Sequence, residues 1–271
     1  MTGRLDELLA IMERLRGANG CPWDRAQTFA TIAPFTIEEA YEAADAAERG
    51  DMAHLKDELG DLLFQVVFYA QMAAEAGLFD FAAIAAAICD KLIRRHPHIF
   101  GAGSEGAQPR DAAAQLAVWE DIKALERSAA GPGPRGGSSA LDGVPPALPA
   151  LMRAHKLSKR AARVGFDFAV AAETADKVAE ELAEVRVAAA ENPGPPASPE
   201  IFEEIGDLLF AAANLARKLD VDAEAALRAA NGKFERRFRG MERLAAQRGE
   251  KFETLDLAAQ EALWQEIKRA E

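Results

Sequence analysis

The sequence has few cysteines, few aromatic and β-branched residues, and no long hydrophobic run. Cys21 and Cys89 are the two cysteines among 271 residues, so no disulfide framework is implied and a reducing, cytoplasmic compartment is expected. The richest apolar stretch, 62–88, is interrupted by glutamines and acidic residues, which excludes a transmembrane helix. Residues 1–17 carry charges at helical spacing and lack the apolar stretch of a signal peptide.

Basic residues are also fewer than acidic residues. Lys and Arg number 32 against 44 Asp and Glu, which gives a formal net charge of −12. This balance argues against nucleic acid, and against an anionic membrane surface, as the main partner. Hydrophobic residues make up 49% of the chain, enough to form a core and too many for a disordered protein.

The composition predicts an all-α protein built from bundled helices. Ala, Leu, Glu, Arg and Lys dominate, and apolar residues recur at helical spacing, as in Leu59, Leu62, Leu63 and Val66. One stretch rich in Gly, Pro and Ser, residues 128–146, cannot hold a helix and is expected to be a linker. We therefore predict two domains, 1–127 and 147–271.

The two halves repeat each other, which indicates a tandem duplication. Four blocks recur in the same order: EExxE at 38–42 and 180–184, E[LI]GDLLF at 58–64 and 204–210, KxxRR at 91–95 and 233–237, and WxxIK at 119–123 and 264–268. The first two blocks start 20 residues apart in the first half (38 to 58) and 24 apart in the second (180 to 204). The extra residues lie in the Pro-rich stretch 192–199, which we expect to be a surface loop between two helices.

The acidic blocks predict a metal site in each half. Glu181 and Glu184 share one helix face, and Glu204 and Asp207 share a face of the next helix, so four carboxylates converge if the helices are antiparallel neighbours. Such a group needs a divalent cation as counter-charge; Mg²⁺ suits oxygen ligands best, with Mn²⁺ as a possible substitute. The first half offers the matching set Glu39, Glu42, Glu58 and Asp61, with Glu38 beside it.

These acidic residues have two other interpretations. A di-iron bundle is disfavoured because it requires Glu-x-x-His motifs, which neither half contains, and the four histidines are expected at loops or helix ends. The other alternative is that these residues form ordinary acidic helix faces exposed to solvent. Against it, the LLF after each block indicates that the helix is packed on its other side. The glycines at 60 and 206 also predict a close approach, by a neighbouring helix or by the metal site, since Gly is unfavourable inside a helix.

Basic residues follow the acidic blocks at helical spacing. Lys233 and Arg237 share a helix face with Arg236 beside them, and Lys91 and Arg95 repeat the pair in the first half. Such pairs suit the oxygens of a polyphosphate substrate. The alternative is that these cations pair with acidic residues on the protein surface.

Taken together, these motifs resemble the MazG nucleoside triphosphate pyrophosphohydrolases. The resemblance includes GCPWDRAQT at 20–28, RRHPHIF at 94–100 and KxxKRxxxVGFD at 156–167, and covers the chain except its linker. It implies tandem all-α MazG-like domains, a homodimer, and Mg²⁺-dependent hydrolysis of nucleoside triphosphates to monophosphate and pyrophosphate. It also implies that the second half is catalytic, with Glu181, Glu184, Glu204 and Asp207 as metal ligands and Lys177, Lys233, Arg237 and Trp264 contacting nucleotide.

Further roles follow as hypotheses. Glu180, next to the metal ligands, is the best candidate to orient or deprotonate the attacking water. The first half carries Phe35 where the second has Lys177, so it lacks one expected cation. A non-catalytic nucleotide-binding regulatory module and a purely structural dimerisation module remain as alternatives to the enzyme.

Overall fold

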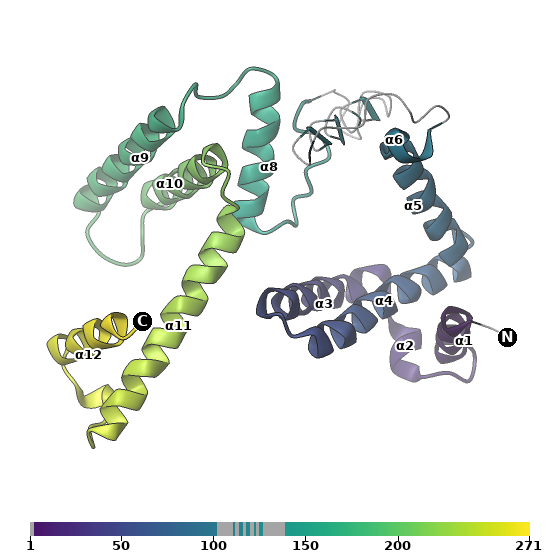
Figure 1. The fold of residues 1–271 in the computed structure, drawn as a ribbon, viewed down its shortest axis with the longest axis horizontal. Coiled ribbons are helices and arrows are strands. Elements are labelled where there is room, and N and C mark those ends of the chain that lie inside the picture. Colours follow the sequence, from purple (N-terminus) through teal and green to yellow (C-terminus); the bar gives the residue numbers. More distant parts are fainter. Residues whose placement is uncertain are drawn as a thin grey trace. The chain divides into compact units, whose positions relative to one another are not determined.

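The computed structural model describes residues 3–101, 139–271 and, between these ranges, positions 111, 114, 115, 118, 119, 122, 125 and 126. Within these residues the protein is all-α, as predicted, and no strand occurs (Figure 1). The chain separates into two compact units, Met1–Ala129 and Ala130–Glu271. The expected domain limits and linker stay predictions, and most of the linker, 128–138, falls outside the described residues. No described helix combines the length and hydrophobicity that crossing a membrane requires.

The first unit is organised around a helical hairpin. Its described helices are α1 (Arg4–Arg16), α2 (Pro22–Ala26), α3 (Phe29–Arg49), α4 (Met52–Glu75), α5 (Phe81–Arg95) and α6 (Pro97–Phe100). Only two residues join α3 to α4. Gly50 ends α3 in the left-handed region (φ 69°), and the Asp51 side chain accepts a hydrogen bond from the His54 backbone N–H at 3.1 Å. This tight connection makes α3 and α4 antiparallel neighbours.

The second unit repeats the hairpin with a longer loop. Its helices are α8 (Ala150–Arg163), α9 (Ala171–Glu191), α10 (Pro199–Lys218), α11 (Ala223–Gln247), the short 3₁₀ helix η1 (Phe252–Thr254) and α12 (Leu257–Arg269). α9 and α3 both have 21 residues, so the extra length lies in the connection 192–198, where residues 192–197 are exposed. The predicted surface loop is confirmed. Ser198 caps α10, and Pro199 occupies its first position.

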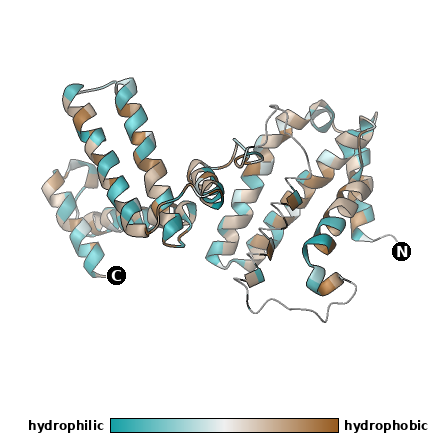
Figure 2. Ribbon diagram, turned by 90° about the horizontal axis from the view of Figure 1, so that it is seen from above, coloured by the Kyte–Doolittle hydropathy of each residue, from teal (hydrophilic) through white to brown (hydrophobic). Residues whose placement is uncertain are grey.

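Each unit buries its own apolar residues. In the first, Met12, Ile32, Val67, Phe68 and Met72 join α1, α3 and α4 and are between 0% and 4% exposed. In the second, Met241, Ala245 and Leu263 fasten α11 to α12. Figure 2 shows hydrophobic and hydrophilic residues alternating along the helices, as expected for amphipathic segments.

Both hairpins also present an apolar face to solvent. Leu59, Leu63 and Val66 are 36% to 51% exposed along α4, and Phe202, Ile205 and Leu209 are 40% to 81% exposed along α10. We call these two sets the outer apolar faces. The LLF blocks are therefore only partly packed within the described chain. The expected close neighbour of Gly60 and Gly206 is also absent there, since a Cβ added at either glycine meets no described atom within 4 Å.

Candidate metal centre

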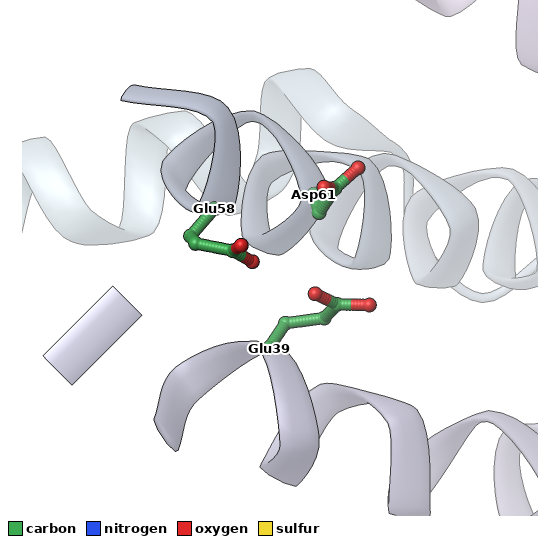
Figure 3. Close-up of side chains that lie close together, drawn as sticks. All are labelled: Glu39, Glu58 and Asp61. Carbon is green, nitrogen blue, oxygen red and sulfur yellow. The ribbon is translucent and has the colours of Figure 1, made fainter. Parts of the chain in front are cut away.

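The hairpin of the first unit gathers three carboxylates, one from α3 and two from α4. Glu39, Glu58 and Asp61 each offer an oxygen, and these oxygens lie within 4.8 Å of one another (Figure 3). Glu58 and Asp61 share a face because they are three residues apart, and the antiparallel packing of α3 brings Glu39 opposite them. Glu58 is only 7% exposed, which removes it from most of the solvent that would otherwise stabilise its charge.

The second unit holds the matching group. Glu181 comes from α9, and Glu204 and Asp207 come from α10, again with ligand oxygens within 4.8 Å of one another. Glu181 is buried, at 6% exposure, as its counterpart Glu58 is. The convergence expected from the sequence thus occurs in both halves for three of the four residues in each set.

The fourth residue of each set lies beside the group of three. The Glu184 carboxyl shares a hydrogen bond with that of Glu181, which raises the pKa of Glu184, and burial and the negative charges of Glu181 and Glu204 act in the same direction. Glu42 is close enough to Glu39 to repel its charge. Both residues contribute to the negative potential, and neither belongs to the trio of oxygens within 4.8 Å.

Charge crowding is visible at Glu39. Burial raises the pKa of this carboxyl above its usual range, and the charges of Asp61, Glu42, Glu58 and Glu38 raise it further. A carboxyl in this situation resists ionisation unless a positive charge is supplied. The group therefore has the electrostatic character of a cation site.

A different basic side chain contacts each group. In the second unit the Lys177 ammonium lies 2.7 Å from Glu181 Oε1 and 2.8 Å from Glu180 Oε1. In the first unit His54 Nε2 lies 3.1 Å from Glu58 Oε1, one helical turn away on α4. His54 is at a helix end, as expected for the histidines, but its place beside the carboxylates was not predicted. The clue in the sequence is its i, i+4 spacing to Glu58.

The arginines expected to bind phosphate are engaged by two glutamates that the sequence analysis missed. Arg237 Nη2 lies 2.6 Å from Glu271 Oε2, and its guanidinium sits over Trp264, 5.4 Å from the ring centroid. Arg95 Nη2 lies 2.6 Å from Glu126 Oε2. The sequence does indicate that the two glutamates correspond, because each follows the matched tryptophan (119 or 264) by seven residues.

The remaining basic candidates are placed on the same helices. Lys91 lies on α5, and Lys233 and Arg236 lie on α11, where all three are exposed. Lys233 and Arg236 are close enough to Glu271 to lower the pKa of its carboxyl, after the larger effect of its hydrogen bond to Arg237. Among the described residues, then, the basic cluster of α11 gathers at Glu271, while the carboxylates of α9 and α10 form a separate group.

Comparison with known proteins places this arrangement in a family. Residues 27–100 match the family model for the MazG nucleotide pyrophosphohydrolase domain, and residues 148–233 match that for phosphoribosyl-ATP pyrophosphohydrolase. The chain is 54% identical over 269 residues to the nucleoside triphosphate pyrophosphohydrolase of Escherichia coli K12, covering 99% of this chain and 98% of the relative. The chain belongs to the MazG family of nucleoside triphosphate pyrophosphohydrolases.

A more distant bacterial relative matches at similar coverage. The nucleoside triphosphate pyrophosphohydrolase/pyrophosphatase MazG of Thermotoga maritima is 40% identical over 263 residues, covering 97% of this chain and 95% of the relative. Each carboxylate group lies inside one of the two matched regions. This MazG protein is therefore an enzyme with two tandem pyrophosphohydrolase-type domains, and the second resembles a related pyrophosphohydrolase family.

The donor set of both groups suits a hard divalent cation. All three ligand atoms are carboxylate oxygens, which Mg²⁺ and Mn²⁺ prefer, and one carboxylate in each group is buried. Asp61 and Asp207 are exposed, so each group is open to solvent on one side. The residues present therefore fit a divalent cation.

This crowding predicts that neutralising one carboxylate stabilises the metal-free protein. Glu39→Gln should raise Tm at pH 7 in the presence of a chelator by roughly 2 °C or more. Because the pKa of Glu39 is raised by folding, its ionisation costs stability as pH rises through that pKa, and the gain from Gln should disappear at pH values below the usual glutamate pKa. Differential scanning calorimetry of the wild type and of Glu39→Gln at several pH values would measure this difference in Tm.

The exposed neighbour Glu38 provides the control. Glu38→Gln removes the same charge from outside the trio and should change Tm by much less. Equal shifts for the two variants, or a loss of stability in Glu39→Gln, would contradict the repulsion argument.

Proposed function

We propose that the protein hydrolyses nucleoside triphosphates to nucleoside monophosphate and pyrophosphate, using Mg²⁺ at Glu181, Glu204 and Asp207, with Mn²⁺ as a substitute. The convergence of these three carboxylates carries the proposal. The names of the E. coli and T. maritima relatives support the reaction, and the all-oxygen donor set supports the metal. The bound ion would polarise the phosphoryl oxygens and lower the pKa of a coordinated water.

Glu180 is placed for a role in positioning the attacking water. It lies next to the ligand Glu181 but outside the trio, and its carboxylate is held by Lys177 at 2.8 Å. It therefore keeps a free oxygen that can accept a proton or orient a water molecule. Glu184, hydrogen-bonded to Glu181, would complete the ligand set or fix the orientation of that ligand.

The basic cluster of α11 would receive the phosphates. Arg237 presents a guanidinium that already binds one carboxylate, Glu271, so its geometry suits an oxyanion. Lys233 and Arg236 add positive charge nearby, and Trp264 supplies an aromatic surface under Arg237. In the first half Lys91 and Arg95 correspond to Lys233 and Arg237.

Product analysis tests the proposed reaction. Purified protein with ATP and Mg²⁺ should yield AMP and pyrophosphate by ³¹P NMR, and Glu181→Ala should reduce the rate by on the order of 10²–10³-fold or more. Circular dichroism should show that the helices of this variant are retained, because the change removes charge repulsion. Glu39→Ala is the matched control in the first half and should retain the products.

The opposite results are equally clear. Orthophosphate and ADP as products would contradict cleavage between the α and β phosphates. An absence of turnover with every nucleoside triphosphate would contradict the reaction itself and favour a non-catalytic nucleotide-binding module. Loss of activity in Glu39→Ala as well would show that the second half does not act alone.

The contact between Arg237 and Glu271 gives a second prediction. Arg237→Ala should raise KM for the triphosphate by about 10–100-fold, because a charged phosphate contact is lost. Glu271→Gln should lower KM, since it removes the carboxylate that competes with phosphate for the same guanidinium. Steady-state kinetics of both variants measure this, and shifts in the same direction would contradict competition.

We also propose that the protein is a homodimer assembled through the outer apolar faces. The outer apolar faces of α4 and α10 are too exposed for an isolated soluble chain, and a second copy offers identical apolar faces. The open space at Gly60 and Gly206 lies on these same helices and allows a partner to approach closely. We further propose that the domains span 1–127 and 147–271 and that the protein is cytoplasmic.

Sedimentation tests the assembly. The wild type should sediment at twice the chain mass of 29.1 kDa, and the double variant Leu63→Glu, Leu209→Glu should sediment as a single chain because it places charges in the interface. Glu substitution at Leu78, which is 66% exposed and lies outside both hairpins, is the control and should leave the dimer intact. A monomeric wild type, or a dimeric double variant, would contradict this assembly.

A further inference from the structure

The two carboxylate groups match in their acids and differ in the basic side chain that contacts them. The Lys177 ammonium contacts both Glu181 and Glu180, at 2.7 and 2.8 Å. The matched position in the first half, three residues before the EExxE block, is Phe35, whose side chain bears no charge. The first group is contacted instead by an imidazole, His54, on the other helix of its hairpin.

An ammonium bound to a metal ligand opposes the binding of a divalent cation. Lys177 holds Glu181 Oε1 at 2.7 Å, so an ion entering the second group must either displace the ammonium or remain beside a like charge. A triphosphate changes this balance, because its oxygens offer the ammonium another partner and add negative charge to the site. The first group has the uncharged Phe35 at the matched position, and its basic contact is the imidazole of His54, at Glu58.

We propose that Lys177 makes divalent cation binding at the second group conditional on nucleotide, while the first group, with Phe35 in its place, binds its cation without nucleotide. This rests on the proposed function, which places a divalent cation at the second group, and it extends that role to the matching carboxylates of the first group. Lys177 is in this view a positioning residue that neutralises Glu180 and Glu181 between turnovers and moves to phosphate when substrate binds. The first half would hold a resident cation throughout.

Manganese binding to the full-length protein tests the order of binding. The free Mn²⁺ signal in electron paramagnetic resonance, at fixed pH, should reveal one tight ion per chain without nucleotide. Glu39→Gln should abolish this ion and Glu181→Gln should retain it. Addition of α,β-methylene-ATP, whose bond between the α and β phosphorus atoms resists hydrolysis, should add a second protein-bound ion in the wild type but not in Glu181→Gln.

Exchanging the two residues isolates the cause. Lys177→Phe should let the second group bind Mn²⁺ without nucleotide, with affinity higher by on the order of tenfold or more. Phe35→Lys should weaken the first group by a similar factor. Neither position is buried, so the exchanged side chains can reach solvent. Lys177→Met, with a flexible uncharged chain, replaces Lys177→Phe if that variant fails to fold.

Either of two results would overturn the inference. One is a wild-type second group that is filled without nucleotide; the other is unchanged Mn²⁺ binding in folded Lys177→Phe or Lys177→Met. Failure of the proposed function has a different signature: no conversion of ATP to AMP and pyrophosphate, together with no Mn²⁺ at either group. Turnover with two equivalent, nucleotide-independent ions would overturn the inference alone.

Discussion

Each unit holds carboxylates together in a packed hairpin, and their mutual repulsion must be offset. In each unit, one helix brings a glutamate and its antiparallel neighbour brings a glutamate and an aspartate, with oxygens within 4.8 Å. Helix packing fixes the backbones, so these acids cannot separate to relieve their repulsion. The remaining ways to stabilise them are protonation, a side-chain cation or a bound metal ion. The raised pKa of Glu39 and the ion pair of Lys177 with Glu181 are the first two of these.

Duplication has given the two halves the same acids and different surroundings. Lys177 pairs with Glu181 in one half, while in the other half Phe35 stands at the matched position of the sequence and His54 contacts Glu58. The arginine ion pairs, by contrast, are repeated closely, since Arg95 binds Glu126 as Arg237 binds Glu271. The common scaffold therefore includes the carboxylate trio and the arginine–glutamate pair. Lys177 is one feature that separates the halves, and it lies in the half that we propose to be catalytic.

Local patterns predicted most of this architecture. Helical periodicity and the repeated blocks predict both hairpins, and the difference of four residues between the blocks predicts the exposed loop before Ser198. The i, i+3 spacing of Glu58 with Asp61 predicts a shared face, and the tight turn at Gly50 brings Glu39 to it. Contacts across long stretches of sequence were not accessible in this way. The pairing of Arg95 with Glu126 depends on how a later segment returns to α5, which periodicity does not encode.

The exposed leucines show a second limit. An apolar stripe predicts that a helix face is packed against another element, but the pattern is the same whether that element belongs to this chain or to another copy. Val67 and Phe68 are covered within the first unit, whereas Leu59 and Leu63 on the same helix are not. Gly60 shows the same limit. The sequence predicts a close approach at this glycine but does not indicate which molecule approaches, and no described atom lies within 4 Å of a Cβ added there.

Anomalous diffraction from crystals grown with Mn²⁺ and α,β-methylene-ATP would show whether each hairpin gathers its carboxylates to hold a divalent cation. We expect one manganese peak among Glu181, Glu204 and Asp207 and another among Glu39, Glu58 and Asp61. Manganese bound elsewhere, with both carboxylate trios free of anomalous density, would contradict this expectation.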